Sequence, residues 1–187
     1  MSPNRRDALK TLGTGIAVLA GGTGTALARG PEGRGRKGAS AEKGIVATAD
    51  ELGFSTLITA VKAADPVVLQ TLTNDDQYTV FAPTNGAFEN FFATVEAATD
   101  LTPADLLQDK KGLLTKTLLF HVTGGRRYAA SVVNAPEVDT LLGEPVTVDD
   151  GTLDGRAAIQ TTNVEASNGV IHAIDAVLTP PAVDDLL

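Results

Sequence analysis

The sequence predicts an α+β fold, with helices in the first half of the domain and strands in the second half. Apolar residues recur at helical spacing up to residue 121. One helix face has apolar residues at positions i, i+3, i+4 and i+7, namely Phe88, Phe91, Phe92 and Val95. From Val132 onward apolar and polar residues alternate, and Asp-Gly pairs separate short runs. One early β-prone segment, residues 78–82, completes the expected sheet.

Three short helices are expected before this first strand. Residues 45–51 give the first, and Gly53 interrupts it. Apolar spacing from Phe54 to Val61 gives the second, which stops before Pro66 because the residue preceding a proline avoids helical backbone angles. Residues 67–72 give a short third helix.

The segment YTVFAPTNGAF joins the first strand to the Phe-rich helix. Phe81 lies in the strand, and Pro83 ends it because proline has no N–H to donate. Thr84 or Asn85 then caps the helix with its side-chain oxygen. Exposure of a Phe cluster would be costly, so we expect Phe88 and its neighbours to be major core residues.

Two further helices follow, before the strands of the second half. Thr102 and Pro103 predict a helix start, with the proline at the first helical position. The apolar face from Leu113 to His121 predicts the next helix, which Gly124-Gly125 is expected to end.

The second half is expected to consist of hairpins and one central strand. Asp150-Gly151 and Asp154-Gly155 predict turns, and residues 158–164 a strand. Asn168-Gly169 predicts a further turn because both residues tolerate positive φ. The strand after it, residues 170–178, is apolar on both faces apart from His172 and Asp175, as expected of a central strand.

The N-terminus has the pattern of an export signal. Arg5-Arg6 is followed by a weakly apolar stretch and by Ala26-Leu27-Ala28, a small-x-small cleavage site. We therefore interpret residues 1–28 as a twin-arginine signal peptide; a disordered basic tail is the alternative. Residues 29–43 are Gly-rich and basic and are expected to be a flexible linker. The domain then covers residues 44–180, and residues 181–187 remain as a short tail.

Charge divides the chain sharply. The whole chain carries −8, but residues 44–187 hold seven Lys/Arg and twenty Asp/Glu, a net charge of −13. Such a field disfavours nucleic acid and anionic membranes as partners. Together with the export pattern it suggests a salt-loving archaeon, with a high-GC bacterium as the alternative. The chain has no Cys, which excludes disulfides and thiolate metal sites.

Four segments in this order resemble the fasciclin-like domain family: GIVATADELGFSTLITAV, YTVFAPTNGAF, LLFHVTGG and NGVIHAIDAVLTPP. The resemblance spans residues 44–180. It implies a wedge-shaped β-sandwich of short strands flanked by several helices, secreted or displayed at the cell surface, which mediates adhesion and has no catalytic residues. The motif residues are then structural: Phe81, Pro83, Thr84, Asn85, Phe88, His121, Gly169, His172 and Asp175.

Two positions depart from the family pattern. The family usually has Tyr-His where this chain has Phe120-His121. In animal relatives an Asp-Ile pair linked to integrin recognition precedes the closing segment, and the matching residues here are Asn163-Val164. Since the carboxylate is absent, integrin binding of the animal type is not expected. The edge formed by Asn163, Val164 and Asn168 remains the candidate adhesion site.

Other chemical candidates have simpler structural explanations. His121 and His172 lie on apolar faces and are expected to be core residues rather than ligands. Ser167 lies in a turn rather than a nucleophile elbow. Asp150 to Thr161 matches only the first half of a calcium loop, so a hairpin is favoured and no metal or cofactor is expected. The basic pairs Lys110-Lys111 and Arg126-Arg127 are solvated charges or a docking patch for acidic polysaccharide.

The sequence therefore predicts a non-catalytic extracellular adhesion or matrix-interaction module. Its expected partner is a cell-surface or matrix protein or a polysaccharide, and the mature chain is not expected to insert into a membrane. The alternative is a secreted carrier of an apolar small molecule such as a pigment. An enzyme is the third class, for which the sequence offers no active site.

Overall fold

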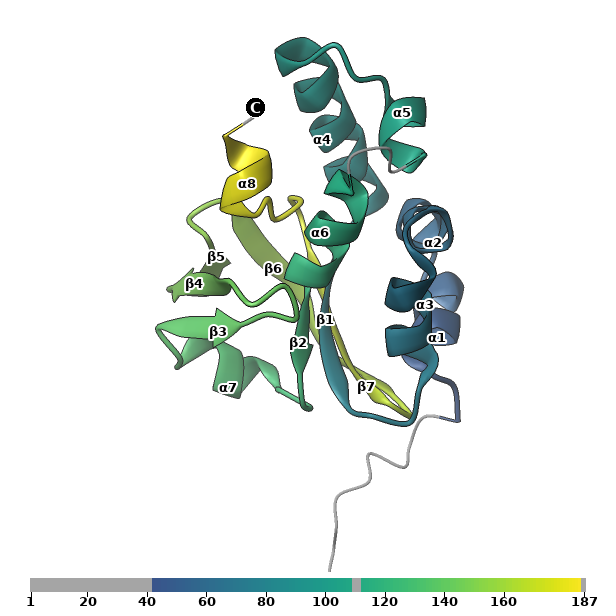
Figure 1. Ribbon diagram of the computed structural model, residues 1–187. Coiled ribbons are helices and arrows are strands. Elements are labelled where there is room, and N and C mark those ends of the chain that lie inside the picture. The colour runs from purple at the N-terminus through teal and green to yellow at the C-terminus, as the bar shows by residue number, and fades with distance from the viewer. Residues whose placement is uncertain (1–41, 109–111, 186–187) are drawn as a thin grey trace, which may run out of the picture. The chain divides into compact units, whose positions relative to one another are not determined.

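A computed structural model describes residues 42–108 and 112–185 (Figure 1). The helices are α1 (Ile45–Glu51), α2 (Ser55–Ala63), α3 (Pro66–Thr73), α4 (Asn85–Ala98), α5 (Pro103–Leu107), α6 (Leu113–Phe120), α7 (Ala129–Val133) and α8 (Pro181–Asp184). The strands are β1 (Tyr78–Pro83), β2 (Val122–Gly124), β3 (Glu137–Asp139), β4 (Pro145–Asp149), β5 (Thr152–Leu153), β6 (Ala157–Ala166) and β7 (Gly169–Ile174). The predicted α+β fold class is confirmed.

The seven strands pair in the order β2-β1-β7-β6-β5-β4-β3. All neighbours are antiparallel except β1 and β7, which run parallel from Tyr78 beside Gly169 to Pro83 beside Ile174. Every residue of β7 is buried, as expected of a strand that is apolar on both faces. The prediction of a central closing strand is therefore confirmed.

Two apolar clusters lie on opposite faces of β1 and β7. The first cluster joins α1–α6 to one face of the sheet and includes Val80, Ile171 and Phe88. The second cluster includes Phe81 and Ile174 and is covered by residues of β3, β4, β5 and α7. In Figure 1, α1, α2 and α3 lie to the right of β1 and β7, and β3–β5 lie to the left. The sheet thus bends around the second cluster while the helices cover the first.

The capping interactions follow the sequence signals closely. The Thr84 hydroxyl accepts the Ala87 N–H at 3.3 Å and is the N-cap of α4. Asn85 instead ties α4 to the preceding helices, since its side chain accepts the Thr56 N–H and donates to the Gly53 carbonyl. At α5 the Thr102 and Asp105 side chains form a reciprocal capping box. Phe88 is 1% exposed, which confirms its expected place in the core.

Several predicted boundaries are wrong, and strand pairing explains the first of them. The helix expected to reach Gly124 ends at Phe120, because Val122 pairs with Val80 and starts β2. Val132 lies in α7 rather than in a strand. β7 stops at Ile174 rather than at Leu178, although the alternation of buried faces continues beyond it. Residues 181–184, expected in a tail, form α8, whose Val183 is buried.

The turn lies one residue earlier than predicted, at Ser167 and Asn168, and Gly169 begins β7 opposite Ala166. Neither Asn168 nor Gly169 has positive φ. Glycine is required because a Cβ at position 169 would lie 2.1 Å from the Tyr78 carbonyl oxygen and 2.6 Å from Ile45 Cδ1. The close approach of β7 to β1 and α1 therefore leaves no room for a side chain.

Asn168 is a buried connector among three elements. Its Oδ1 accepts the Ile45 N–H at 2.8 Å, which caps the start of α1 from a distance. Its Nδ2 donates to the Leu72 carbonyl at 2.9 Å and to the Asn74 carbonyl at 3.0 Å, at the end of α3. Its own carbonyl accepts the Tyr78 N–H at the start of β1. One side chain thus satisfies backbone groups that two helix ends leave open.

His121 is a second buried connector, at the C-terminus of α6. Its Nδ1–H donates to the Thr117 carbonyl at 2.7 Å, and its Nε2 accepts the Leu178 N–H at 2.9 Å. Both ring nitrogens are used, and only the neutral ring fits because protonated Nε2 would meet another donor. Burial lowers the pKa of His121 to about 4, against the opposing effect of the hydrogen bond to Thr117.

This burial predicts that the domain loses stability in mild acid. In the unfolded chain His121 titrates near 6.5, so below that pH the unfolded state takes up a proton that the folded state refuses. The free energy of unfolding should fall by about 1.4 kcal/mol per pH unit between pH 6.5 and about 4 from this group alone. Chemical denaturation across this range measures the slope. His121→Gln should be less stable at pH 7 but flatter with pH; an unchanged slope would contradict the assignment.

Candidate interaction surface

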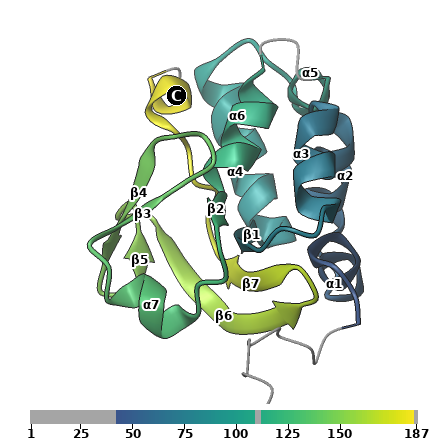
Figure 2. The same cartoon turned by 60° about the horizontal axis from the view of Figure 1, so that its bottom comes forward.

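The most exposed irregular segment of the sheet lies in the middle of β6. This strand pairs with β7 along its length but with β5 only at Ala157 and Ala158, so most of its outer edge has no partner strand among the residues described (Figure 2). The pairing with β7 shifts register twice, between Ile159 and Thr161 and again between Thr161 and Val164. These bulges turn the strand outward, and residues 160–163 are all exposed.

Asn163 fixes the shape of the second bulge. It has φ of 59°, in the left-handed region that Asn tolerates better than most residues. Its N–H donates to His172 Nδ1 at 3.3 Å, and its side-chain oxygen accepts the Ala129 N–H at 2.7 Å, at the start of α7. The segment is therefore exposed yet anchored to both its neighbouring strand and a helix.

The three expected adhesion residues have different environments. Asn163 is exposed, Val164 is half-buried against the first cluster, and Asn168 is buried with its amide used internally. Asn168 must therefore be removed from the expected edge. Gln160, Thr161 and Thr162 lie in the same exposed segment as Asn163, and the polar run QTTN inside an apolar strand is the sequence signal that marks them.

His172, on the neighbouring strand β7, holds the exposed segment of β6 in place through hydrogen bonds and ring stacking. Its Nε2–H donates to the Arg127 carbonyl at 2.9 Å, its Nδ1 accepts from Asn163, and its ring stacks on Phe81 at 5.9 Å between centroids. Burial lowers the pKa of His172, and the hydrogen bond to Arg127 opposes the shift. All four ring nitrogens of His121 and His172 are thus bonded to backbone groups. Within the described residues no hydrogen bond joins the Ser167 hydroxyl to either ring.

The acidic turns have structural roles. Asp150 and Gly151 both have positive φ and connect β4 to β5, so the predicted hairpin is confirmed. The Asp154 carboxylate accepts the Thr147 N–H at 2.8 Å, across the hairpin. Asp175 accepts the Ala158 N–H and the Gln160 side-chain amide, which extends the β6–β7 pairing. Within residues 42–108 and 112–185, no three His, Asp or Glu side chains are grouped as a metal site would need.

Of the basic pairs, Arg126-Arg127 lies in the described part of the chain and has structural contacts. The Arg126 guanidinium donates to Gln77 and to the carbonyls of Ala166 and Ser167, so it holds the β6–β7 turn. The Arg127 N–H donates to the Thr79 hydroxyl. Lys110-Lys111, the export pair Arg5-Arg6 and the linker up to residue 41 lie outside the described residues.

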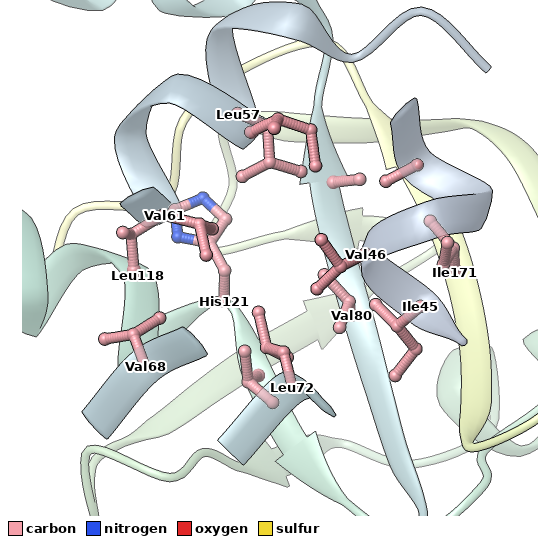
Figure 3. Close-up of a pocket in the computed structure, with 14 residues that line it drawn as sticks. Ile45, Val46, Leu57, Val61, Val68, Leu72, Val80, Leu118, His121 and Ile171 are labelled. Carbon is pink, nitrogen blue, oxygen red and sulfur yellow. The ribbon is translucent and has the colours of Figure 1, made fainter. Parts of the chain in front are cut away.

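The interior offers little space for a small molecule. Figure 3 shows side chains of α1, α2, α3, β1 and α6 converging on an apolar cavity of about 20 Å³, with His121 at one side. A second cavity of about 20 Å³ lies between α4, α5 and α6. Sites for drug-sized ligands measure about 300–1,000 Å³. Each cavity is about the size of a single water molecule and far too small for a pigment.

Among the helices described, none is both long and apolar enough to cross a membrane.

Several known proteins are similar to this chain in sequence. Protein sll1483 of Synechocystis sp. is 45% identical over 132 residues, which are 68% of this chain and 68% of that protein. Immunogenic protein MPB70 of Mycobacterium bovis is 34% identical over 151 residues, 78% of this chain and 73% of that protein. Cell surface glycolipoprotein MPB83 of the same species is 34% identical over 134 residues, 69% of this chain and 56% of that protein.

A solved structure shares the fold at low identity. The FAS1 domain pair from the insect cell adhesion molecule Fasciclin I superposes with a TM-score of 0.56 and 16% identity, covering 79% of this chain and 53% of that chain. The Fasciclin domain family model matches residues 52–180. This match covers well over half of the sequence and includes the paired strands β1 and β7. The chain therefore belongs to the Fasciclin domain family.

Proposed function

We propose that the protein is an extracellular, non-catalytic adhesion module that binds its partner through the exposed segment of β6, residues 160–163. The observation that carries the proposal is the contrast between this segment and the other motif residues. Five motif residues use their side-chain polar groups in internal hydrogen bonds: Asn85, His121, Asn168, His172 and Asp175. Residues 160–163 are all exposed instead. The Gln160 amide bonds to Asp175 and the Asn163 oxygen to the Ala129 N–H, whereas the hydroxyl groups of Thr161 and Thr162 face solvent.

Charge and shape favour recognition by side chains at this segment. Gln160, Thr161, Thr162 and Asn163 are uncharged, whereas residues 44–187 carry −13 overall. An uncharged patch recognises its partner by hydrogen bonding and shape rather than by charge. The two bulges interrupt the strand edge, which opposes simple strand addition. We therefore infer a neutral polysaccharide or a surface protein as the partner.

The relatives support a surface role. MPB83 is by name a cell surface glycolipoprotein, and the structural neighbour comes from a cell adhesion molecule. The two apolar cavities between the helices and the sheet and among α4, α5 and α6 do not favour the carrier alternative, because each measures about 20 Å³.

The segment is tested best by removing its hydroxyl groups. Asn163 is a poor probe because Ala at φ 59° would itself cost about 1 kcal/mol. Thr161→Ala with Thr162→Ala should leave the thermal melt nearly unchanged and reduce binding to cell envelopes of the source organism by roughly tenfold, as expected when contact residues are lost. Thr59→Ala with Thr94→Ala, at helix positions away from β6, is the matched control. Equal binding by the two double variants would remove β6 from the proposal.

We further propose export through the twin-arginine route, because Arg5-Arg6, an apolar stretch and a cleavage site follow one another in the order of an export signal. Replacing both arginines by lysine should stop secretion while the folded domain keeps its melting temperature. N-terminal sequencing of the secreted wild-type protein should start at or near Arg29. Secretion of the Lys-Lys protein at the normal level would rule the route out.

The acidity of the domain also supports a salt-rich habitat. With −13 on residues 44–187, repulsion between like charges destabilises the folded state at low ionic strength. The melting temperature should therefore rise steadily from low to molar KCl. A flat response would identify an ordinary acidic secreted domain.

A further inference from the structure

A spacious groove lies over α1, α2 and the end of α3. It measures about 470 Å³, within the range of ligand sites and far above the enclosed cavities. Its walls come from α1, α2, residues 72–75 and the turn at Ser167 and Asn168. It shares no residue with the exposed segment of β6, so it is a separate surface.

The floor of this groove is apolar and backed by empty space. Val46, Ile58 and Leu72 line the groove and also line the 20 Å³ cavity beneath it. Figure 3 shows Val46 and Leu72 directed into that cavity. Ala47 adds an exposed methyl group beside them. Such a floor accepts aliphatic groups, and the void below gives its side chains room to adjust.

The rim of the groove is predominantly acidic. Asp50 and Asp75 stand at the rim, both exposed, and Lys62 is the basic residue among the lining side chains. A basic side chain already docks on the same helix, since the Lys43 ammonium pairs with Glu51 at the end of α1. The Lys43 carbonyl accepts the Ser167 N–H at the groove wall. Thus α1 already holds a cation from the chain that leads into it.

We propose that this groove docks a basic, amphipathic peptide segment of a partner protein. Aliphatic side chains and the stems of Lys or Arg would lie on Val46, Ala47 and Leu72, while their cationic ends would meet Asp50 and Asp75. The field of the domain attracts such a segment and repels anionic lipid, nucleic acid and acidic polysaccharide. The protein would then carry two surfaces, one for a neutral partner and one for a basic partner.

The test uses the full chain and a short synthetic peptide of Lys and Leu at helical spacing, with a Glu-for-Lys peptide as control. At about 0.15 M salt, fluorescence anisotropy should show binding of the Lys peptide but not of the Glu peptide. Ala47→Arg should fill part of the groove and repel the Lys side chains of the peptide, and so weaken binding by roughly tenfold. Ala97→Arg, the same change at an exposed position of α4, should have little effect.

A charge-matched pair separates the groove from the general field. Asp50→Asn with Asp75→Asn should weaken binding several times more than Asp139→Asn with Asp149→Asn, which changes the net charge equally on β3 and β4. Equal losses, or no binding of the Lys peptide to the wild-type chain, would overturn the proposal. Thr161→Ala with Thr162→Ala should leave peptide binding unchanged, so failure at the groove and failure at β6 are distinguishable.

Discussion

The close passage of β7 past β1 and α1 at Gly169 is the constraint on which the rest of the fold depends. There the Tyr78 carbonyl and the Ile45 side chain occupy the space that a Cβ would need. The preceding residue, Asn168, fills the same corner with an amide that bonds the start of α1 and the end of α3. The helices are thereby fixed to the parallel strand pair β1 and β7. The first apolar cluster packs next to this corner, and the second packs on the opposite face of β1 and β7.

The same use of buried polar groups explains why the motif residues are a poor guide to the binding surface. Buried polar side chains must have partners, and here they take them from backbone groups left open at helix ends and strand ends. His121 and His172 are neutral connectors of this kind, with pKa values lowered by burial. The two surfaces that we propose for recognition, the bulges of β6 and the groove beside α1, use other residues.

Much of the fold was predictable because local signals and tertiary packing agree. The Phe-rich face of α4, the caps at Thr84 and Thr102, and the all-apolar β7 followed from spacing and side-chain chemistry. An error occurred where long-range pairing overrides local pattern, since β2 is a strand because β1 lies beside it. The predicted adhesion edge fits the structure only in part. Asn163 is exposed, but Asn168 is only 7% exposed, and its burial depends on tertiary contacts that the sequence does not reveal.

The corner at Gly169 is tested most directly by comparing two Gly→Ala variants in chemical denaturation. Gly86, in the first turn of α4, has no positive φ and no atom within 4 Å of the position that a Cβ would take, so Gly86→Ala should be neutral or stabilise by about 0.5–1 kcal/mol. Gly169→Ala must displace the Tyr78 backbone, and its free energy of unfolding should fall by about 3 kcal/mol or more. A Gly169→Ala protein as stable as the wild type would contradict the account, because the corner would then be loose rather than close-packed.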